Sequence, residues 1–228
     1  SVILLAGGKG LRMGSTLPKQ YMLLKGKTVS EHSFDVFLRI REIQEVIVVC
    51  GEDRCAIFKR SNCQKRIAFA LPGKRRQDSV FQGLQKVSKD IEYVCIHDSA
   101  RPCLSENFVR DVITAAKSCG AAALGLPLKF TVKEVEALGM VKRTLKRENI
   151  WEVQTPQVLS LSLLQRGFAK AKKENLTVTD DVSLAELMGS AVQLIKGSSK
   201  NIKITTPEDL IVVDRLLDLE SNTVGQTK

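Results

Sequence analysis

A glycine-rich segment near the start of the chain combines backbone amides with two cations. Residues 6–13 read AGGKGLRM, directly after an apolar run, and residues 18–20 read PKQ. Glycines let the backbone turn tightly and bring its N–H groups close to a ligand. Together with the cations of Arg12 and Lys19, such amides suit a polyphosphate. For the glycines alone, a plain turn without a ligand is the alternative.

This segment matches neither of two common phosphate-binding motifs. A P-loop ends in Gly-Lys-Ser/Thr, which does not occur here, and Met13 stands where a dinucleotide fingerprint has its third glycine. Any nucleotide bound by the segment is therefore held in a third way.

Two further polar clusters each follow a predicted strand. Residues 73–79 read GKRRQDS and open a predicted helix, where Gly73 permits close backbone approach and Ser79 offers a hydroxyl to a base or ribose. Residues 97–102 read HDSARP, and a carboxylate such as Asp98 at the end of a strand can hold Mg²⁺ beside a phosphate. An aspartate that caps its own loop is the alternative for Asp98, and a solvated charged face is the favoured interpretation of Lys74 and Arg75.

Composition narrows the class of protein. The chain has 228 residues, of which 43% are hydrophobic, so it can bury a full core in one large domain or two small ones. A net charge of +10 favours an anionic partner, either nucleic acid or phosphorylated metabolites. Only 5% of the residues are aromatic and no arginine-rich tract occurs, which disfavours a nucleic-acid-binding protein. No apolar run approaches ~18 residues, so we expect no membrane span and no membrane partner.

The six cysteines predict neither a disulfide framework nor a zinc site. No Cys-x-x-Cys pair occurs, and the chain has only two histidines. Cys50 and Cys95 lie in apolar strand-like runs, where a reduced thiol packs as a small hydrophobic side chain. We therefore expect reduced cysteines in a reducing compartment.

Strand and helix patterns alternate along the first half of the chain. The predicted strands are Val2–Leu5, Glu45–Cys50, Arg66–Leu71, Tyr93–His97 and Ala121–Leu126. The predicted helices between them lie near Ser30–Ile40, Asp53–Lys59, Arg76–Lys86 and Glu106–Ser118. Because the strands are almost continuously apolar, we expect a parallel sheet covered by helices on both faces. Ligands of such sheets bind beyond the carboxyl ends of the strands, where the glycine segment and both polar clusters lie.

The pattern changes between residues 127 and 153. Charged and apolar residues nearly alternate in 129–135 and again in 140–145, which predicts a β-hairpin inserted into an α/β domain. A hairpin is marginally stable alone, so we expect this arm to pack on something, such as a second subunit.

The remaining elements complete a single domain over residues 1–220. The pattern predicts helices at Leu161–Glu174 and Pro207–Leu219, a short helix capped by Thr179 or Asp180, and strands at Val192–Ile195 and Ile202–Ile204. Polar clusters lie beside predicted strands at 151–157 and 201–207, and we expect residues 221–228 to form a frayed tail.

Seven motifs, taken in order, resemble those of one enzyme family. They are AGGxGxRM, PKQ, RQDSV, HDSARP, QTPQ, TDD and NIKITTPEDL, and the match runs from Val2 to Leu219. By these motifs the chain is similar to the 2-C-methyl-D-erythritol 4-phosphate cytidylyltransferases of the non-mevalonate isoprenoid pathway. The resemblance implies a three-layer α/β/α, Rossmann-like nucleotidyltransferase fold with a mostly parallel sheet and an inserted β-arm. It also implies that CTP and 2-C-methyl-D-erythritol 4-phosphate react to give 4-diphosphocytidyl-2-C-methyl-D-erythritol and pyrophosphate, with Mg²⁺ as cofactor.

The resemblance also assigns roles to individual residues. The positions that match catalytic residues at the reacting phosphates are Arg12, Lys19 and Lys203. Those that match CTP-binding residues are Ala6, Gly7, Gly8, Gly10, Gly73, Ser79, Asp98 and Ala100. Those that match substrate-binding residues are Thr131, Arg147, Thr155, Thr179 and Arg101. The metal would lie at Asp98.

The resemblance implies a homodimer formed through the arm. Thr131 and Arg147 would then reach methylerythritol phosphate across the dimer. Two alternatives are a cytidylyltransferase for another polyol phosphate, such as ribitol 5-phosphate, and a non-catalytic basic module that binds nucleic acid. The expected compartment is the plastid stroma or the bacterial cytoplasm, and the lack of an initiator methionine favours the plastid.

Overall fold

A seven-stranded β-sheet forms the centre of the computed structural model, which describes residues 1–8 and 17–225. From one edge to the other, its strands are β11 (Gln193–Lys196), β7 (Ala121–Pro127), β10 (Trp151–Ser160), β6 (Tyr93–Asp98), β1 (Val2–Leu5), β4 (Glu45–Val49) and β5 (Arg66–Ala70). Strand β10 runs antiparallel to its neighbours β7 and β6, whereas the other pairings in this sheet are parallel. The prediction of a mostly parallel sheet is therefore confirmed.

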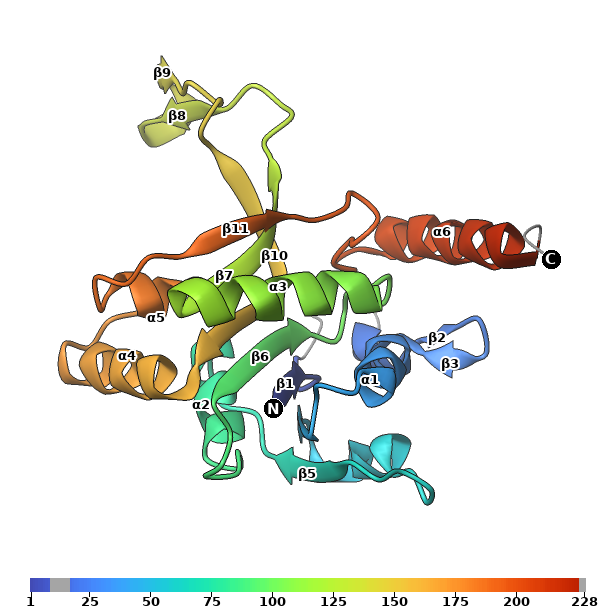
Figure 1. The fold of residues 1–228 in the computed structure, drawn as a ribbon. Helices are drawn as coiled ribbons and strands as arrows, with labels where there is room; N and C mark the ends of the chain where they lie inside the picture. The colour runs from blue at the N-terminus through green and yellow to red at the C-terminus, as the bar shows by residue number, and fades with distance from the viewer. Residues whose placement is uncertain (9–16, 226–228) are drawn as a thin grey trace.

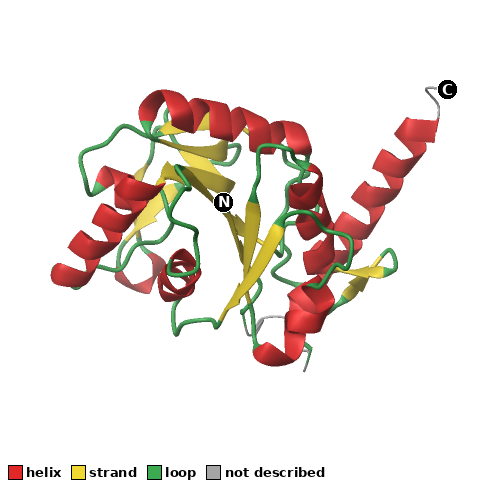
Figure 2. Ribbon diagram, turned by 60° about the horizontal axis from the view of Figure 1, so that its bottom comes forward, coloured by secondary structure: helices red, strands yellow, loops and turns green. Residues whose placement is uncertain are grey.

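Helices cover both faces of this sheet, so the fold has three layers (Figures 1 and 2). The described α-helices are α1 (Val29–Arg39), α2 (Arg76–Leu84), α3 (Glu106–Cys119), α4 (Leu161–Lys173), α5 (Ser183–Glu186) and α6 (Pro207–Gly225). Helices α1 and α3 pack on one face, and α2, α4 and α5 pack on the other. The parallel sheet covered on both faces that the strand pattern predicts is confirmed, and it has the α/β/α, Rossmann-like architecture that the resemblance implies.

Alternation along the strands supplies a hydrophobic core to each face. In β1, Val2 and Leu4 belong to the core under α1 and α3, whereas Ile3 belongs to the core under α2 and α4. All three side chains are fully buried. Complete burial of such a side chain contributes about 1.5–3 kcal/mol, so a sheet buried on both faces requires nearly continuous apolar strands.

An arm leaves the sheet between β7 and β10 and stands away from the rest of the fold (Figure 1). It consists of β8 (Lys133–Val135) and β9 (Val141–Thr144), paired antiparallel and joined by the 3₁₀ turn η4 (Ala137–Gly139). Gly139 has a φ of 76°, a left-handed conformation that glycine adopts without steric cost. The hairpin predicted between residues 127 and 153 is thus confirmed.

One predicted strand is wrong. Residues 202–204 form no strand, and Ile204 instead packs in a small core with Leu24 and Val213. The helical segment predicted near Asp53–Lys59 is present as the 3₁₀ helix η3 (Glu52–Phe58). At residues 202–204 the apolar spacing is real, but it serves the packing of a coil rather than a strand.

Further elements are absent from the sequence-based prediction or differ in length. The pattern does not predict β10, nor the 3₁₀ helix η2 (Lys19–Tyr21), nor the small hairpin of β2 (Leu23–Leu24) and β3 (Lys27–Thr28). Helix α6 continues to Gly225, into the segment expected to fray, and projects from the body of the fold (Figure 1). Within residues 1–8 and 17–225, none of the helices is both long and apolar enough to cross a membrane.

Candidate active site

A cleft of about 970 Å³ opens at the carboxyl ends of β1 and β6, the edge at which parallel sheets bind ligands. The predicted site residues that line it are Gly7, Gly8, Lys19, Gly73, Ser79, Asp98, Ala100 and Lys203. Ala6 is buried beside this group, and Gly10 and Arg12 lie outside the described residues. Segments far apart in the sequence therefore meet in one cleft, as the motif series predicts.

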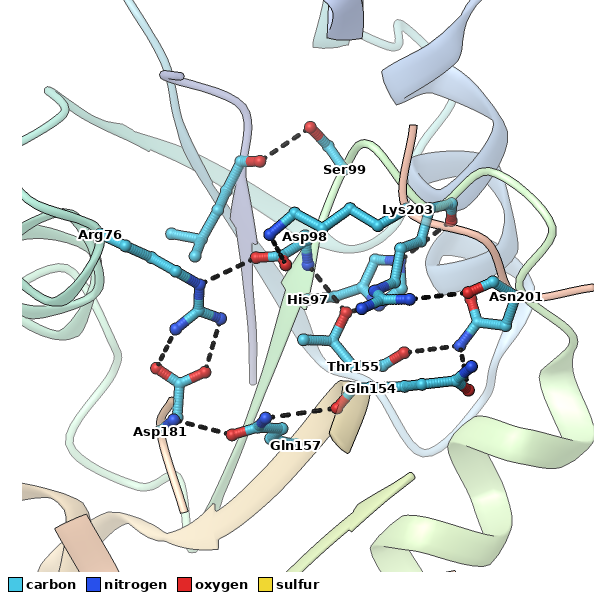
Figure 3. Close-up of polar contacts among 12 residues, drawn as sticks. Arg76, His97, Asp98, Ser99, Gln154, Thr155, Gln157, Asp181, Asn201 and Lys203 are labelled. Atoms are coloured by element: carbon cyan, nitrogen blue, oxygen red, sulfur yellow. Dashed lines mark hydrogen bonds and ion pairs between the residues drawn. The ribbon is translucent and has the colours of Figure 1, made fainter. Parts of the chain in front are cut away.

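The carboxylate of Asp98 is held between two cations (Figure 3). Its Oδ1 accepts a hydrogen bond from Arg76 Nε at 3.0 Å, and its Oδ2 accepts one from Lys203 Nζ at 2.6 Å. Burial raises the pKa of Asp98, but the charges of Arg76 and Lys203 outweigh burial and hold the pKa well below its usual range. Asp98 is therefore ionised at neutral pH.

Arg76 is itself fixed by a second carboxylate. Its Nη1 and Nη2 donate to the two oxygens of buried Asp181 at 2.8 and 2.7 Å, a bidentate pair (Figure 3). The backbone N–H groups of Asp181 and Val182 donate to Gln157 Oε1 at 2.8 and 3.0 Å, which anchors the loop that carries this carboxylate. Arg76 and Asp181 are not among the predicted site residues, although each lies within one of the seven motifs, RQDSV and TDD, which is the signal that could have found them.

Thr155 and His97 form a chain of hydrogen bonds behind Asp98 (Figure 3). The Asp98 N–H donates to Thr155 Oγ1 at 3.1 Å, and Thr155 Oγ1 lies 3.1 Å from His97 Nδ1. The Arg101 carbonyl can only accept, so His97 Nε2, 3.2 Å away, carries the proton of the neutral ring, and Nδ1 accepts from the Thr155 hydroxyl. Burial lowers the pKa of His97 to about 4, so the ring is neutral at pH 7. Together these bonds fix the loop from Asp98 to Arg101.

The loop between β5 and α2 is closed by its own polar contacts. Ser79 Oγ accepts a hydrogen bond from the Gly73 N–H at 3.0 Å and donates to the Arg75 carbonyl at 3.2 Å. A Cβ on Gly73 would lie 2.4 Å from the Cβ of Asp78, so a larger residue does not fit there. These contacts shape the wall of the cleft, and contact of Gly73 or Ser79 with a base stays a prediction.

Mg²⁺ fits this cleft as an ion shared with a substrate. Residues 1–8 and 17–225 contain no group of three or more His, Cys, Asp or Glu side chains that could hold a metal. Asp98 offers one carboxylate at the cleft. Protein-bound Mg²⁺ commonly uses one or two carboxylates together with substrate phosphates and several waters. The donor set therefore suits an ion that arrives with a triphosphate.

The predicted substrate-binding residues lie outside the lining of the cleft: Arg101, Thr131, Arg147, Thr155 and Thr179. Arg101 Nη1 donates to the Asn201 carbonyl at 2.7 Å, and burial lowers the pKa of Arg101. Thr131 and Arg147 are exposed on the arm, where the Arg147 guanidinium donates to the Lys129 carbonyl. Thr179 is exposed as well. Thr155 and Arg101 therefore hold the Asp98 loop from behind the cleft, whereas Thr131, Arg147 and Thr179 are exposed and do not line it.

Relatives of known sequence share nearly the whole chain. A family model described as 2-C-methyl-D-erythritol 4-phosphate cytidylyltransferase matches residues 1–218. A protein of Oryza sativa subsp. japonica, named 2-C-methyl-D-erythritol 4-phosphate cytidylyltransferase, chloroplastic, is 49% identical over 220 residues, which cover 96% of this chain and 74% of the rice protein. A Chlamydia pneumoniae protein named 2-C-methyl-D-erythritol 4-phosphate cytidylyltransferase is 41% identical over 217 residues, covering 95% of this chain and 98% of its own.

Solved structures share the fold. A 4-diphosphocytidyl-2C-methyl-D-erythritol synthase from Anaerococcus prevotii matches with a TM-score of 0.84 and 30% identity, covering 95% of this chain and 97% of that one. The 2-C-methyl-D-erythritol 4-phosphate cytidylyltransferase from Thermus thermophilus matches with a TM-score of 0.79 and 31% identity, covering 96% and 98%. Sequence and fold therefore agree that the chain belongs to the 2-C-methyl-D-erythritol 4-phosphate cytidylyltransferase family.

Proposed function

We propose that the cleft transfers a cytidylyl group from CTP to 2-C-methyl-D-erythritol 4-phosphate and releases pyrophosphate, the isoprenoid-pathway reaction of its family. An oxygen of the substrate phosphate attacks the α-phosphorus of CTP in line with the departing pyrophosphate. The nucleophile is a phosphate monoester whose second pKa is ~6, so it is largely dianionic at pH 7 and needs no general base. The buried, neutral His97 agrees with a reaction that uses no histidine base.

The observation that carries this proposal is the charge of the cleft. Lys19, Arg76 and Lys203 line it, and Asp98 is the acidic residue among its described lining. The main obstacle to the reaction is the approach of one anion to another. Catalysis therefore reduces to in-line positioning and to neutralising charge on the pentacoordinate phosphorus. We assign this neutralisation to Lys19 and Lys203, together with Arg12 from outside the described residues.

Lys203 can bind a phosphate of CTP if its ammonium leaves the carboxylate of Asp98. Its ammonium contacts Asp98 Oδ2, while Arg76 independently holds Asp98 Oδ1. If Lys203 turns to a phosphate, Arg76 still neutralises Asp98, so the buried carboxylate is not left unpaired. Asp98 would also hold Mg²⁺, which supplies further neutralisation of the phosphate charges when it is bound.

The arm supports a homodimer. It exposes Phe130, Leu138 and Met140, with 76, 101 and 68% of each residue accessible to water. A two-stranded hairpin is marginally stable alone, and a second copy packed on the arm would cover these exposed apolar side chains. In the proposed homodimer, Thr131 and Arg147 of one copy contact methylerythritol phosphate in the cleft of the other. This arrangement accounts for their distance from the lining of the cleft in their own chain.

Release of pyrophosphate tests the reaction directly. The purified protein is incubated with CTP, Mg²⁺ and either 2-C-methyl-D-erythritol 4-phosphate or ribitol 5-phosphate. We expect release with the first compound, and preference for ribitol 5-phosphate would support a different polyol cytidylyltransferase. Salt-sensitive binding of DNA or RNA without pyrophosphate release would support a nucleic-acid-binding module. The family match favours neither alternative.

We also propose a plastid location. The rice relative, at 49% identity, is named as chloroplastic, and the Chlamydia pneumoniae relative is less similar, at 41% identity. An antibody against the chain should detect it in the stromal fraction of plastids isolated from its source. Detection in the cytosol alone would contradict the proposal.

A further inference from the structure

Gln20, which follows the glycine segment in the chain, is bonded to the first residues of that segment. Its side-chain Nε2 donates to the Ala6 carbonyl at 2.8 Å and to the Gly8 carbonyl at 2.6 Å. A primary amide has two N–H hydrogens, so both donors are used on the protein and neither is left for a substrate. The residue is only 3% exposed, which makes these bonds costly to lose.

Tyr21 supports the same carbonyl from a second direction. Its hydroxyl donates to the Ala6 carbonyl at 2.7 Å, and its ring packs in the hydrophobic core beside the first sheet face. The Arg54 guanidinium lies 4.9 Å from the centre of the ring. Burial raises the pKa of Tyr21, so the hydroxyl stays a donor throughout the physiological pH range.

These bonds fix the direction of a peptide group at the cleft. A trans peptide holds its N–H opposite its C=O, so anchoring the Ala6 carbonyl turns the Gly7 N–H to the other side. Gly7 and Gly8 line the cleft, and neither N–H bonds to any residue of 1–8 or 17–225. A Cβ on Gly7 would lie 2.4 Å from Pro72 Cβ, so the backbone is also packed closely against the neighbouring loop.

We propose that Gln20 is a positioning residue for cytidylyl transfer, which presets the backbone of residues 6–8 to receive the triphosphate of CTP. Tyr21 is the second donor of the clamp, which we define as the hydrogen bonds from Gln20 and Tyr21 to the carbonyls of Ala6 and Gly8. The proposal rests on the binding of CTP at the glycine segment, as proposed above. A backbone held in its binding conformation before CTP arrives loses less entropy on binding, so the clamp acts on CTP affinity more than on the second substrate.

Gln20→Met tests the clamp, because methionine keeps the length of the side chain and removes both donors. We expect the KM for CTP to rise about tenfold or more, as follows from two lost hydrogen bonds. The KM for methylerythritol phosphate should stay unchanged, and the rise in Tm caused by CTP should shrink. Tyr21→Phe removes one donor and keeps the ring in the core, so we expect a smaller rise in the KM for CTP.

Lys65→Met is the matched control. Lys65 Nζ also donates to two backbone carbonyls, those of Ile40 and Ile43, at 2.8 and 2.5 Å, but it does not line the cleft. The variant Lys65→Met should therefore lower Tm without changing the KM for CTP.

An unchanged KM for CTP in Gln20→Met would overturn the proposal. Equal rises in the KM for CTP and in the KM for methylerythritol phosphate would overturn it as well. If Gln20→Met does not fold, an unchanged KM for CTP in Tyr21→Phe overturns it instead. Lys19→Ala separates the two proposals. Unchanged kinetics with CTP in Lys19→Ala would place the triphosphate elsewhere and overturn both. Impaired kinetics in Lys19→Ala together with an unchanged KM for CTP in Gln20→Met would overturn only the role of Gln20.

Discussion

Replacing Thr155 with valine tests the hydrogen-bond chain behind the cleft. Valine keeps the shape of the side chain but removes the hydroxyl, which leaves the Asp98 N–H and His97 Nδ1 without their partner. Thr155 and His97 are buried, with 3% and 0% of each residue exposed, so water cannot readily replace the lost bonds. Each unsatisfied buried group costs about 1–3 kcal/mol, so we expect the two groups together to lower the free energy of unfolding by about 2–6 kcal/mol.

Urea denaturation followed by circular dichroism measures this free energy of unfolding. Thr155→Ser is the matched control, because it keeps the hydroxyl and loses one methyl group worth about 1 kcal/mol. The reasoning predicts that Thr155→Val is clearly less stable than Thr155→Ser. Equal stability of the two variants, or an unchanged free energy of unfolding in Thr155→Val, would refute it and leave the hydroxyl free for a substrate.

The arm, the transfer of Lys203 from Asp98 to a phosphate, and the buried His97 each give a further prediction. Arg147→Ala should raise the KM for methylerythritol phosphate and leave the KM for CTP unchanged; equal loss of both in steady-state kinetics would argue against a role across the dimer. Lys203→Met should lower kcat in the pyrophosphate assay with little change in circular dichroism, because Arg76 still holds Asp98; an unchanged kcat would remove Lys203 from the reaction. In the folded protein His97 gains its proton near pH 4 rather than 6.5, so the unfolded chain binds more protons between these values and stability falls by about 3 kcal/mol as the pH drops through them. His97→Asn should abolish that share of the pH dependence, and identical slopes for both proteins in urea denaturation would contradict the assignment.

Burial on both faces makes the parallel strands predictable from the sequence. Strands β1 and β4 must be apolar at nearly every position, and that pattern is visible without a structure. Strand β10 is different, because its middle contains Gln154, Thr155 and Gln157, which resemble a polar loop. In the structure all three are buried and hydrogen-bonded to partners distant in the sequence, which a local pattern does not reveal.

The candidate site is predictable to the extent that it consists of motifs at strand ends. Asp98 follows a strand, so its place at the cleft follows from topology. The pairing of Arg76 with Asp181 does not, because it joins side chains brought together only by packing of α2 against the loop before α5. Lys203 reaches the cleft from a coil segment rather than the predicted strand, so its position there did not depend on regular structure.

The central claim is that the cations of this cleft stabilise cytidylyl transfer from CTP to methylerythritol phosphate. Steady-state pyrophosphate release by Lys19→Ala tests it most directly, with circular dichroism to confirm the fold. Loss of one contact made in the transition state predicts a fall in kcat of roughly 10²-fold or more, with a much smaller rise in the KM for CTP. An unchanged kcat would contradict the claim and place the chemistry outside this cleft.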